Sequence, residues 1–351
     1  MSSMKTTLRD VAERVGTTTG VVSVALNGAK SKTLRVSDET RQKVLQAAAE
    51  LGYRRDLRGT ALATGRSHVI GLMLPYVGSF KAPDPFYSIV TAGVAAGAYA
   101  CGYNLMLYTA VAEEEGERAA ESVDRRIDGL VLVTPLPGTP VLDECRRLGI
   151  ATVCVDQFPA QEPLTVNADD YHGGLLAVNH LLELGHRRIA HLYGHEDNYQ
   201  NDLRFRGYRD SLSRAGIEFD PDLVLRGGFQ RNMSLLSTRK LLALPDHKGP
   251  TAIFAINDLA AHGALEAIAE AGLEVPNDIS VVGYDDTWYA SITNPPLTSV
   301  CTNVDQIGRR AAELLIAKLQ GRTEEAHLVI PVSLTMRRSS GPPRHSKGQP
   351  Q

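Results

Sequence analysis

The sequence predicts an N-terminal, all-α helix-turn-helix headpiece followed by an α/β core of two doubly wound parallel-sheet lobes. The first 62 residues contain short amphipathic helix patterns in a basic setting. From Val69 onward, apolar strands alternate with amphipathic helices in two successive series. At 351 residues the chain is long enough for two or three domains.

The first predicted helix begins after Thr7, the expected N-cap, and has Asp10 near its positive end. Its apolar face repeats at i, i+3, i+4 and i+7 in Leu8, Val11, Ala12 and Val15. Gly16 breaks this pattern, so we expect the helix to end there.

A second helix is predicted from about Thr18 to the Asn27-Gly28 stop. Its inner face consists of Val22, Ala25 and Leu26. Two short helices joined by a tight turn form a helix-turn-helix, whose second helix can enter a major groove. A small helical subdomain with no nucleic-acid role is the alternative interpretation.

A third helix is predicted from about Asp38 to Leu51, capped by Ser37.

The distribution of charge favours DNA binding by the headpiece. Residues 1–66 hold twelve lysines and arginines against six acidic residues, a net charge of +6, whereas the whole chain carries −3 and the remainder therefore −9. A basic head on an acidic body is expected when only the head meets phosphates.

The core is predicted from its alternating elements. The first series has strands at 69–74, 104–109, 129–133 and 151–156 and helices near 86–101, 113–126 and 139–148. The second has strands at 188–193, 223–228, 251–256 and 279–285, helices near 172–184, 202–215, 232–244 and 259–271, and a last helix over about 304–319. Ligands of such sheets bind beyond the carboxyl ends of the strands, so we expect a small molecule in the cleft between two facing lobes.

These patterns define four expected regions. They are a helix-turn-helix domain over 1–53, a linker over 54–67, a core of two β/α lobes over 68–338, and a polar, disordered tail over 339–351.

Composition excludes several classes of protein. No apolar run reaches the ~18 residues of a membrane span, and the N-terminus lacks a secretory apolar region, so a cytoplasmic protein without a membrane partner is expected. The four cysteines form no CxxC pair and are expected to be buried, reduced thiols: Cys101, Cys145, Cys154 and Cys301.

Enzymatic readings find little support in the sequence. The chain contains no GxSxG, GxxxxGK[ST] or GxGxxG motif. Its adjacent aspartate pairs, Asp169-Asp170 and Asp285-Asp286, point in divergent directions. The spacing of His186, His191 and His195 is poor for a metal site. We therefore expect no enzyme, no metal and no cofactor.

The order of these parts resembles the lactose-repressor (LacI/GalR) family of bacterial transcription regulators. The resemblance covers about residues 7–338 and is carried by TLRDVAERVG, VSVALNG, SDETRQKVLQAAAELGY, TGRSHVIGLMLP, HLLELGHRRIAHL, AIFAINDLAAHGALEAI, VPNDISVVGYDD and PPLTSV. It implies a headpiece, a hinge helix within the linker over 54–67, and a periplasmic-binding-protein-like core over 68–338 that dimerises and binds a small effector. The two lobes of this core are then expected at about 68–166 with 297–327, and at about 167–296 with 328–338.

DNA contacts are expected from the helix-turn-helix, the loop that follows it and the hinge. The expected residues are Thr7, Thr18, Thr19, Gly20, Val21, Ser23, Val24, Asn27, Arg35, Tyr53, Arg58 and Leu62. Val24 stands where the family often has arginine, which favours contact with thymine methyls over bidentate reading of guanine. Leu62 matches the family's lever leucine, which wedges into the minor groove at the operator centre. Packing on the edge of the core is the alternative for Leu62.

Effector contacts are expected at the strand ends and nearby aromatic residues: Phe86, Tyr87, Asp156, Phe158, Arg204, Asn257, Asp285 and Trp288. Arg204 matches the family's effector-contacting arginine. Arginine, aspartate and asparagine together supply the donors and acceptors that sugar or nucleoside hydroxyls need. Aspartate and asparagine after strands also cap helices, as expected for Asp258. Trp288 is expected in a loop, where its ring either covers a ligand or joins the core.

The expected function is a repressor that binds a pseudo-palindromic operator as a homodimer, because a two-fold dimer reads two half-sites. Its DNA affinity would be set by a small effector, with a sugar favoured over a purine or nucleoside. Ser339–Gln351 contains no leucine heptad, which favours a dimer over a tetramer. The alternative is a periplasmic-type sugar-binding protein without a gene-regulatory role, which would carry a signal peptide and no basic head.

Overall fold

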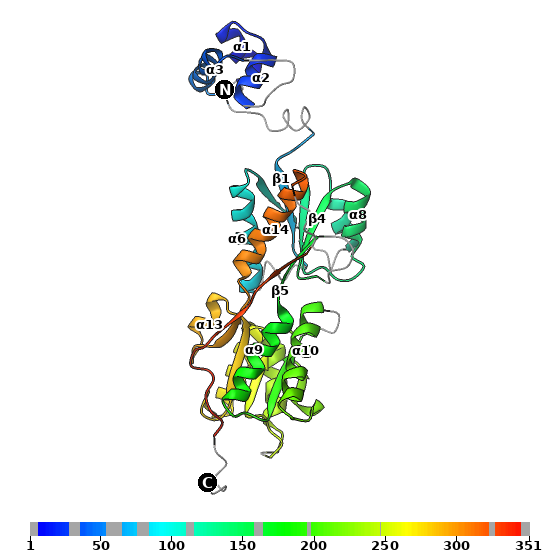
Figure 1. The fold of residues 1–351 in the computed structure, drawn as a ribbon, viewed down its shortest axis with the longest axis vertical. Coiled ribbons are helices and arrows are strands. Elements are labelled where there is room, and N and C mark those ends of the chain that lie inside the picture. Colours follow the sequence, from blue (N-terminus) through cyan, green and yellow to red (C-terminus); the bar gives the residue numbers. More distant parts are fainter. Residues whose placement is uncertain are drawn as a thin grey trace. The chain divides into compact units, whose positions relative to one another are not determined.

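The computed structural model describes residues 6–27, 36–53, 65–75, 84–109, 116–157, 164–194, 198–245, 247–322 and 327–344. Their contacts divide the chain into two compact units, Met1–Ser67 and His68–Gln351 (Figure 1). These units are called the headpiece and the core. Among the described residues, no helix combines the length and apolar character needed to cross a membrane.

Three helices make up the described part of the headpiece: α1 (Leu8–Val15), α2 (Thr19–Asn27) and α3 (Asp38–Glu50). The predicted start of α1 is confirmed, because the Thr7 side chain accepts from the Asp10 backbone N–H while Asp10 accepts from that of Thr7 at 2.7 Å. This reciprocal capping box satisfies two donors that a helix start otherwise leaves unpaired. Gly16 ends α1 in the left-handed region with φ 70°, and Ser37 caps α3 as predicted.

A small apolar cluster holds the three helices together. It contains Val11 and Ala12 of α1, Val22 and Ala25 of α2, and Val44, Ala47 and Ala48 of α3. The predicted inner faces of α1 and α2 therefore meet α3, which leaves the other side of α2 outside this cluster.

The core holds two six-stranded sheets (Figure 1). The first has the order β11 (His327–Ile330), β5 (Leu164–Ala168), β4 (Ala151–Val155), β3 (Gly129–Val133), β1 (Val69–Met73) and β2 (Asn104–Leu107), and all of its strands are parallel. The second has the order β12 (Ser333–Thr335), β10 (Thr298–Cys301), β9 (Ser280–Asp285), β8 (Ala252–Ala255), β6 (Ile189–Tyr193) and β7 (Val224–Arg226). Only β12 is antiparallel to its neighbour.

Helices cover both faces of each sheet, as expected for parallel strands that are buried on both sides. On the first sheet, α6 (Pro85–Ala100) and α14 (Val304–Leu319) pack on one face, and α7 (Gly116–Ser122) and α8 (Pro140–Leu148) on the other. On the second sheet, α9 (Asp170–Glu183) and α10 (Tyr199–Arg214) cover one face, and α11 (Arg231–Leu242) and α12 (Asp258–Glu270) the other.

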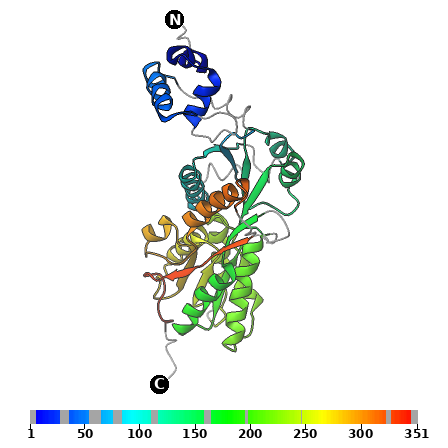
Figure 2. The same ribbon diagram turned by 45° about the horizontal axis from the view of Figure 1, so that its top comes forward.

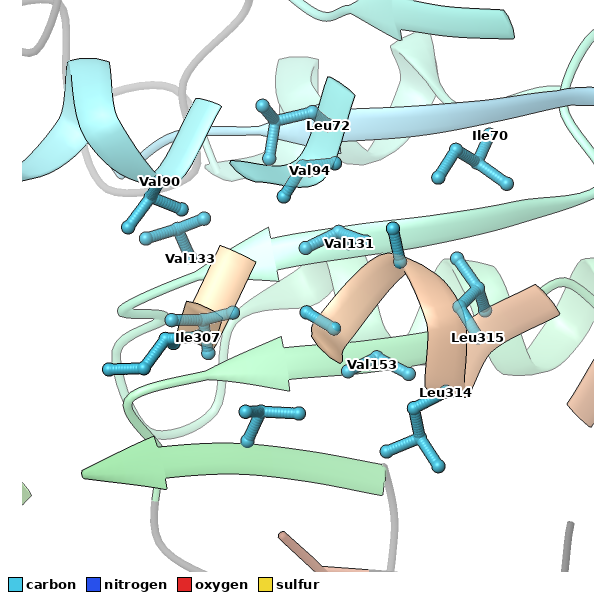
Figure 3. Close-up of a cluster of buried hydrophobic side chains, with 14 of the residues drawn as sticks. Ile70, Leu72, Val90, Val94, Val131, Val133, Val153, Ile307, Leu314 and Leu315 are labelled. Atoms are coloured by element: carbon cyan, nitrogen blue, oxygen red, sulfur yellow. The ribbon is translucent and has the colours of Figure 1, made fainter. Parts of the chain in front are cut away.

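Alternation along the strands explains the two covered faces. In β3 every residue is buried, but Val131 and Val133 face α6 and α14, whereas Leu130 and Leu132 face α7 and α8. Figure 3 shows the first of these two clusters, with Ile307 of α14 above the strands.

The chain passes between the two lobes three times, and two of the predicted boundaries differ from the structure. Thr298–Cys301 was expected in the first lobe but pairs with β9 of the second sheet, and His327–Ile330 pairs with β5 of the first. Strand β11 lies in the first sheet and β12 in the second, so the chain crosses from one lobe to the other between them (Figures 1 and 2). The sequence prediction had no element at β5, β10, β11 or β12.

The predicted disordered tail is wrong for residues 339–344. Ser339 is fully buried; its hydroxyl donates to the Val281 carbonyl at 2.6 Å and accepts from the Thr298 N–H at 2.8 Å. These bonds fasten the segment to the second sheet. Residues 345–351 lie outside the described part of the chain.

Helices α6 and α14 cross at very short distance, which requires glycine. A Cβ atom at Gly308 would lie 2.3 Å from the Val90 carbonyl oxygen, and one at Gly93 would lie 2.3 Å from that of Asp305. Both obstacles are backbone atoms, so no side-chain rotation relieves the clash. This crossing holds the helices that bury the first sheet.

We expect Gly308→Val to lower the free energy of unfolding by roughly 1–3 kcal/mol or more, because the added side chain forces the two helices apart. Gln306→Val is the matched control, since Gln306 is exposed on the same helix. Urea denaturation of both variants measures the difference. Equal effects of the two substitutions would contradict the close crossing.

Candidate functional site

The residues predicted to face DNA lie on the outer side of α2 and at its start. Thr18, Thr19 and Gly20 are exposed, and Val21, Ser23 and Val24 are partly buried. The Thr18 hydroxyl accepts from the Val21 N–H at 3.4 Å. Because Val22 and Ala25 occupy the headpiece core, the predicted DNA residues and the packing residues occupy different faces of one helix.

The other residues predicted to contact DNA lie at several places in the headpiece or outside the described residues. Thr7 is exposed, but its hydroxyl is engaged with Asp10 at 2.8 Å in the capping box. Asn27 ends α2, and Tyr53 packs against the headpiece core. Arg35, Arg58 and Leu62 lie outside the described residues, as does the predicted hinge except for residues 65–67. The lever role of Leu62 stays a prediction.

Arg204 is the centre of a buried polar cluster in the core. It lies on α10 and is 5% exposed. Its Nε donates to Asp170 Oδ1 at 2.8 Å, its NH1 donates to the Ile256 carbonyl at 2.8 Å, and its NH2 lies 3.7 Å from Asp285 Oδ1. The guanidinium also lies 3.8 Å above the centre of the Tyr284 ring. One cation thus links α9 and α10 to β9 and to the residue that follows β8, Ala252–Ala255.

Glycine at the α9–α10 crossing permits this arrangement. A Cβ atom at Gly174 of α9 would lie 2.4 Å from the Arg204 carbonyl oxygen, so α10 approaches α9 at backbone contact distance. This approach sets Arg204 beside Asp170.

The predicted strand-end aspartates are held in unusual backbone conformations. Asp156, directly after β4, has φ 56°, and Asp285, the last residue of β9, has φ 95°. Thr134, directly after β3, has φ 42°. Residues other than glycine adopt such angles at a cost of about 1–3 kcal/mol each, and they gather at functional sites. Here they mark the carboxyl ends of strands in both sheets.

The buried aspartates at these strand ends influence one another's pKa. Burial raises the pKa of Asp156 to about 7, with a further rise from Asp170 and an opposing effect of Arg204. Burial also raises the pKa of Asp285 well above its ordinary value, against Arg204 and with additions from Asp258, Asp84 and Asp156. Since Asp156 ends a strand of the first sheet and Asp285 one of the second, the cluster joins both lobes.

Sequence reasoning missed two members of this cluster. Asp84 is buried and caps α6 through the Phe86 N–H at 3.0 Å; burial raises its pKa to about 6. Asp170 is 1% exposed and bonded to Arg204. In the sequence, Asp84 followed by Pro85 reads only as a helix start, and Asp170 reads only as one of an adjacent pair.

Asn257 is the N-cap of α12, and the prediction of Asp258 for that role was wrong. Asn257 Oδ1 accepts from the Ala260 N–H at 2.8 Å and its Nδ2 donates to the Phe229 carbonyl at 3.2 Å. Asp258 instead accepts from Thr287 N–H at 2.7 Å, from the Thr287 hydroxyl at 2.9 Å and from the Ser299 hydroxyl at 2.6 Å. It fixes the loop that follows Asp285.

The predicted aromatic contacts that the structure describes lie on two helices. Phe86 and Tyr87 open α6 beside Asp84 and meet edge to face. Trp288 was expected in a loop but begins the short helix α13 (Trp288–Ile292) and is 54% exposed. It is therefore not a core residue. Phe158 lies outside the described residues.

The histidines and cysteines fit structural roles. Within the described part of the chain, no group of three or more His, Cys, Asp or Glu side chains could hold a metal ion. His191 is buried between aromatic rings, and burial lowers its pKa to about 4. All four cysteines are free; Cys145 and Cys154 are buried and the other two are partly buried.

Comparison with known proteins matches both units of the chain. Residues 7–56 match the model of bacterial regulatory proteins of the lacI family, and residues 178–340 that of a periplasmic binding protein-like domain. The HTH-type transcriptional regulator CelR of Thermobifida fusca is 33% identical over 347 residues, which cover 95% of this chain and 98% of CelR.

Solved structures resemble the whole chain. A lac repressor dimer bound to operator and the anti-inducer ONPF is 30% identical, with a TM-score of 0.81 over 96% of this chain and 99% of that one. A complex of the transcriptional regulator CelR with cellobiose is 32% identical, with a TM-score of 0.73 over 96% of this chain and 100% of that one. The chain therefore belongs to the lacI family of bacterial regulatory proteins and is a DNA-binding transcriptional regulator.

Proposed function

We propose that the chain is a cytoplasmic repressor whose affinity for a pseudo-palindromic operator is set by a small sugar bound at the buried polar cluster. The observation that carries this proposal is the burial of Asp156 and Asp285 at the ends of strands in opposite lobes, with the Arg204 NH2 3.7 Å from Asp285 Oδ1 and its charge acting on the pKa of Asp156. A ligand placed there contacts both lobes at once and so favours one lobe arrangement over another.

The chemistry of the cluster suits hydroxyl groups. Carboxylates accept hydrogen bonds and a guanidinium donates them, whereas a hydroxyl does both. Trp288, half-exposed and three residues after Asp285, adds a flat ring of the kind that covers the apolar face of a sugar. The cellobiose complex of the similar regulator CelR supports a sugar over a nucleoside.

A homodimer on DNA follows from the same comparisons. The similar lac repressor binds its operator as a dimer, and two headpieces read two half-sites. The headpiece and its match to the lacI family disfavour the periplasmic sugar-binding alternative. We further propose that the chain has no enzymatic activity, since its relatives are regulators.

The switch we propose is a shift between two lobe arrangements. The effector prefers one arrangement, which permits or forbids the two hinges near Leu62 to pair in the minor groove. Thermodynamic linkage then requires operator DNA to change effector affinity by the same factor.

Asp285→Ala tests the assignment of the effector site. We expect operator binding to persist while the response to sugar is lost, because the removed carboxylate leaves ligand hydroxyls unpaired at a cost of about 1–3 kcal/mol, up to about a hundredfold in affinity. The measurement is fluorescence anisotropy on DNA from upstream of the chain's own gene, titrated with cellobiose and with ribose. Asp143→Asn, on the exposed face of α8, is the control. An unchanged sugar response in Asp285→Ala would exclude this site.

A further inference from the structure

The buried cluster contains more carboxyl groups than cations. Asp84, Asp156, Asp170 and Asp285 are each at most 7% exposed, and they come from α6, β4, α9 and β9. Within the described residues, Arg204 is the cation that opposes the rise in the pKa of Asp156, Asp170 and Asp285, whereas the pKa of Asp84 is lowered only by its backbone hydrogen bond from Phe86. The cluster is therefore acidic beyond what its own arginine neutralises.

The charge of Arg204 is already in use within the protein. Its Nε donates a hydrogen bond to Asp170 and its NH1 donates one to the Ile256 carbonyl. The Tyr284 ring packs against the face of the guanidinium. Asp285 lies 3.7 Å from its remaining nitrogen. An anionic group that entered the cluster would meet several carboxyl groups, and Arg204, the cation that the described residues supply there, is already paired.

An unpartnered buried amide points to a ligand independently of the acidic residues. Gln200 is 3% exposed, and its Nε2 has no hydrogen-bond partner among the described residues. It lies one turn before Arg204 on α10, so both side chains project from the same face of that helix. The Thr134 hydroxyl, at the end of β3 in the opposite sheet, is likewise buried without a described partner. A buried polar group without a partner costs about 1–3 kcal/mol, which a ligand hydroxyl at this place would relieve.

We propose that this cluster selects an uncharged or cationic polyhydroxy effector, with its hydroxyl or ammonium donors on Asp84, Asp156 and Asp285, and rejects sugar phosphates and sugar acids. This inference rests on the proposed sugar site and adds its charge selectivity. Gln200 donates a hydrogen bond to a ligand oxygen that in turn donates one to a carboxylate. A hydroxyl group can both accept and donate in this way, whereas the oxygens of a phosphate dianion can only accept.

A matched ligand panel tests the selectivity on the full-length protein by calorimetry at pH 7.5. The probes are glucose, glucosamine, glucuronate and glucose 6-phosphate, with cellobiose beside cellobionate and ribose beside ribose 5-phosphate. We expect an uncharged or amino sugar to bind and its anionic counterpart to bind roughly a hundredfold more weakly or worse, since like charges placed together cost several kcal/mol. Stronger binding of glucosamine than of glucose would identify an ammonium donor, and the reverse order an uncharged one. An anionic sugar that binds as tightly as its parent would overturn the inference.

A second arm needs no ligand and uses Asp156→Asn. Burial raises the pKa of Asp156 to about 7 in the folded protein, with Asp170, Asp285 and Arg204 as its charged neighbours. Ionisation therefore disfavours the folded state, and this destabilisation grows as the pH rises from the unfolded value near ~4 through about 7. Asparagine cannot ionise, so we expect the Tm of Asp156→Asn to exceed that of the parent protein more at pH 8 than at pH 5.

The outcomes of the two arms are distinguishable. If no sugar binds and Asp156→Asn still stabilises the protein at pH 8, the cluster does contain more carboxyl groups than cations, and the proposal of a sugar effector is wrong. If Asp156→Asn gives the same Tm difference at both pH values, the claim that the cluster holds more carboxyl groups than cations is wrong. Asp143→Asn, exposed on α8, is the control and should show no such pH dependence.

Discussion

Arg204→Met is expected to lower the free energy of unfolding of the core by about 3–5 kcal/mol, measured by urea denaturation at pH 7.5. Arg204 and Asp170 are 6% and 1% exposed at their side chains and lie 2.8 Å apart. Removal of the arginine leaves Asp170 as a buried carboxylate without its cation, and it leaves the Ile256 carbonyl without its donor. Methionine fills a similar volume, so the effect reports lost charge more than lost packing.

Two variants separate the buried pair from ordinary surface pairs. Arg204→Met combined with Asp170→Asn should recover much of the loss, because neither partner then carries a buried charge. Arg239→Met breaks a pair with Glu270 whose side chains are 52% and 44% exposed, so it should cost no more than about 1 kcal/mol. A loss for Arg204→Met as small as that for Arg239→Met would show that the cluster is hydrated and not buried.

This structural role changes how Arg204 can be used to study effector binding. A substitution there weakens the core as well as the ligand contact, so a lost sugar response has two causes. Asp285 is a cleaner position, because burial already disfavours its charged form and its only ion-pair contact with Arg204 is at 3.7 Å. We therefore base the test of the effector site on Asp285.

The sequence predicts most of the fold because each element has its own hydrophobic period. The helices of the headpiece and the central strands of both sheets follow from local patterns, as in β3, GLVLV. The strands β5, β10, β11 and β12 do not, since LTVNA, TSVC, HLVI and SLT are short and carry polar residues. They are strands because they pair with neighbouring strands of the two sheets, and local sequence does not record that pairing.

The candidate site divides in the same way. Asp156 and Asp285 were predictable because ligands of parallel sheets meet the carboxyl ends of strands. Arg204 was expected by the same rule and by the family resemblance, but it lies within α10 and not at a strand end. Asp84, Asp170 and Gln200 were missed because their burial arises only when α6, α9 and α10 pack against the sheets. The sequence left open whether Asn257 contacts the effector or caps a helix. In the structure both polar atoms of its side chain form hydrogen bonds within the protein.

Removal of residues 1–67 is expected to abolish specific operator binding, a loss of about a thousandfold or more in affinity. The fragment His68–Gln351 keeps both sheets and should still fold and bind the effector, because the two units make separate clusters of contacts. It lacks α2, and it also lacks the headpiece charge of +6, so its own charge repels the phosphate backbone. For the full-length protein, operator affinity should fall steeply between 50 and 200 mM salt, as about six or more phosphate contacts would require.

Val22→Asp provides the matched control for this experiment without any truncation. Val22 is fully buried where α2 meets α1 and α3, so a carboxylate there unfolds the headpiece while the core stays intact. Fluorescence anisotropy should show the same loss of operator binding in Val22→Asp as in the fragment, with the sugar affinity of both retained. Specific binding of either protein to the operator would place DNA recognition in the core, where the excess of acidic residues gives it no physical basis.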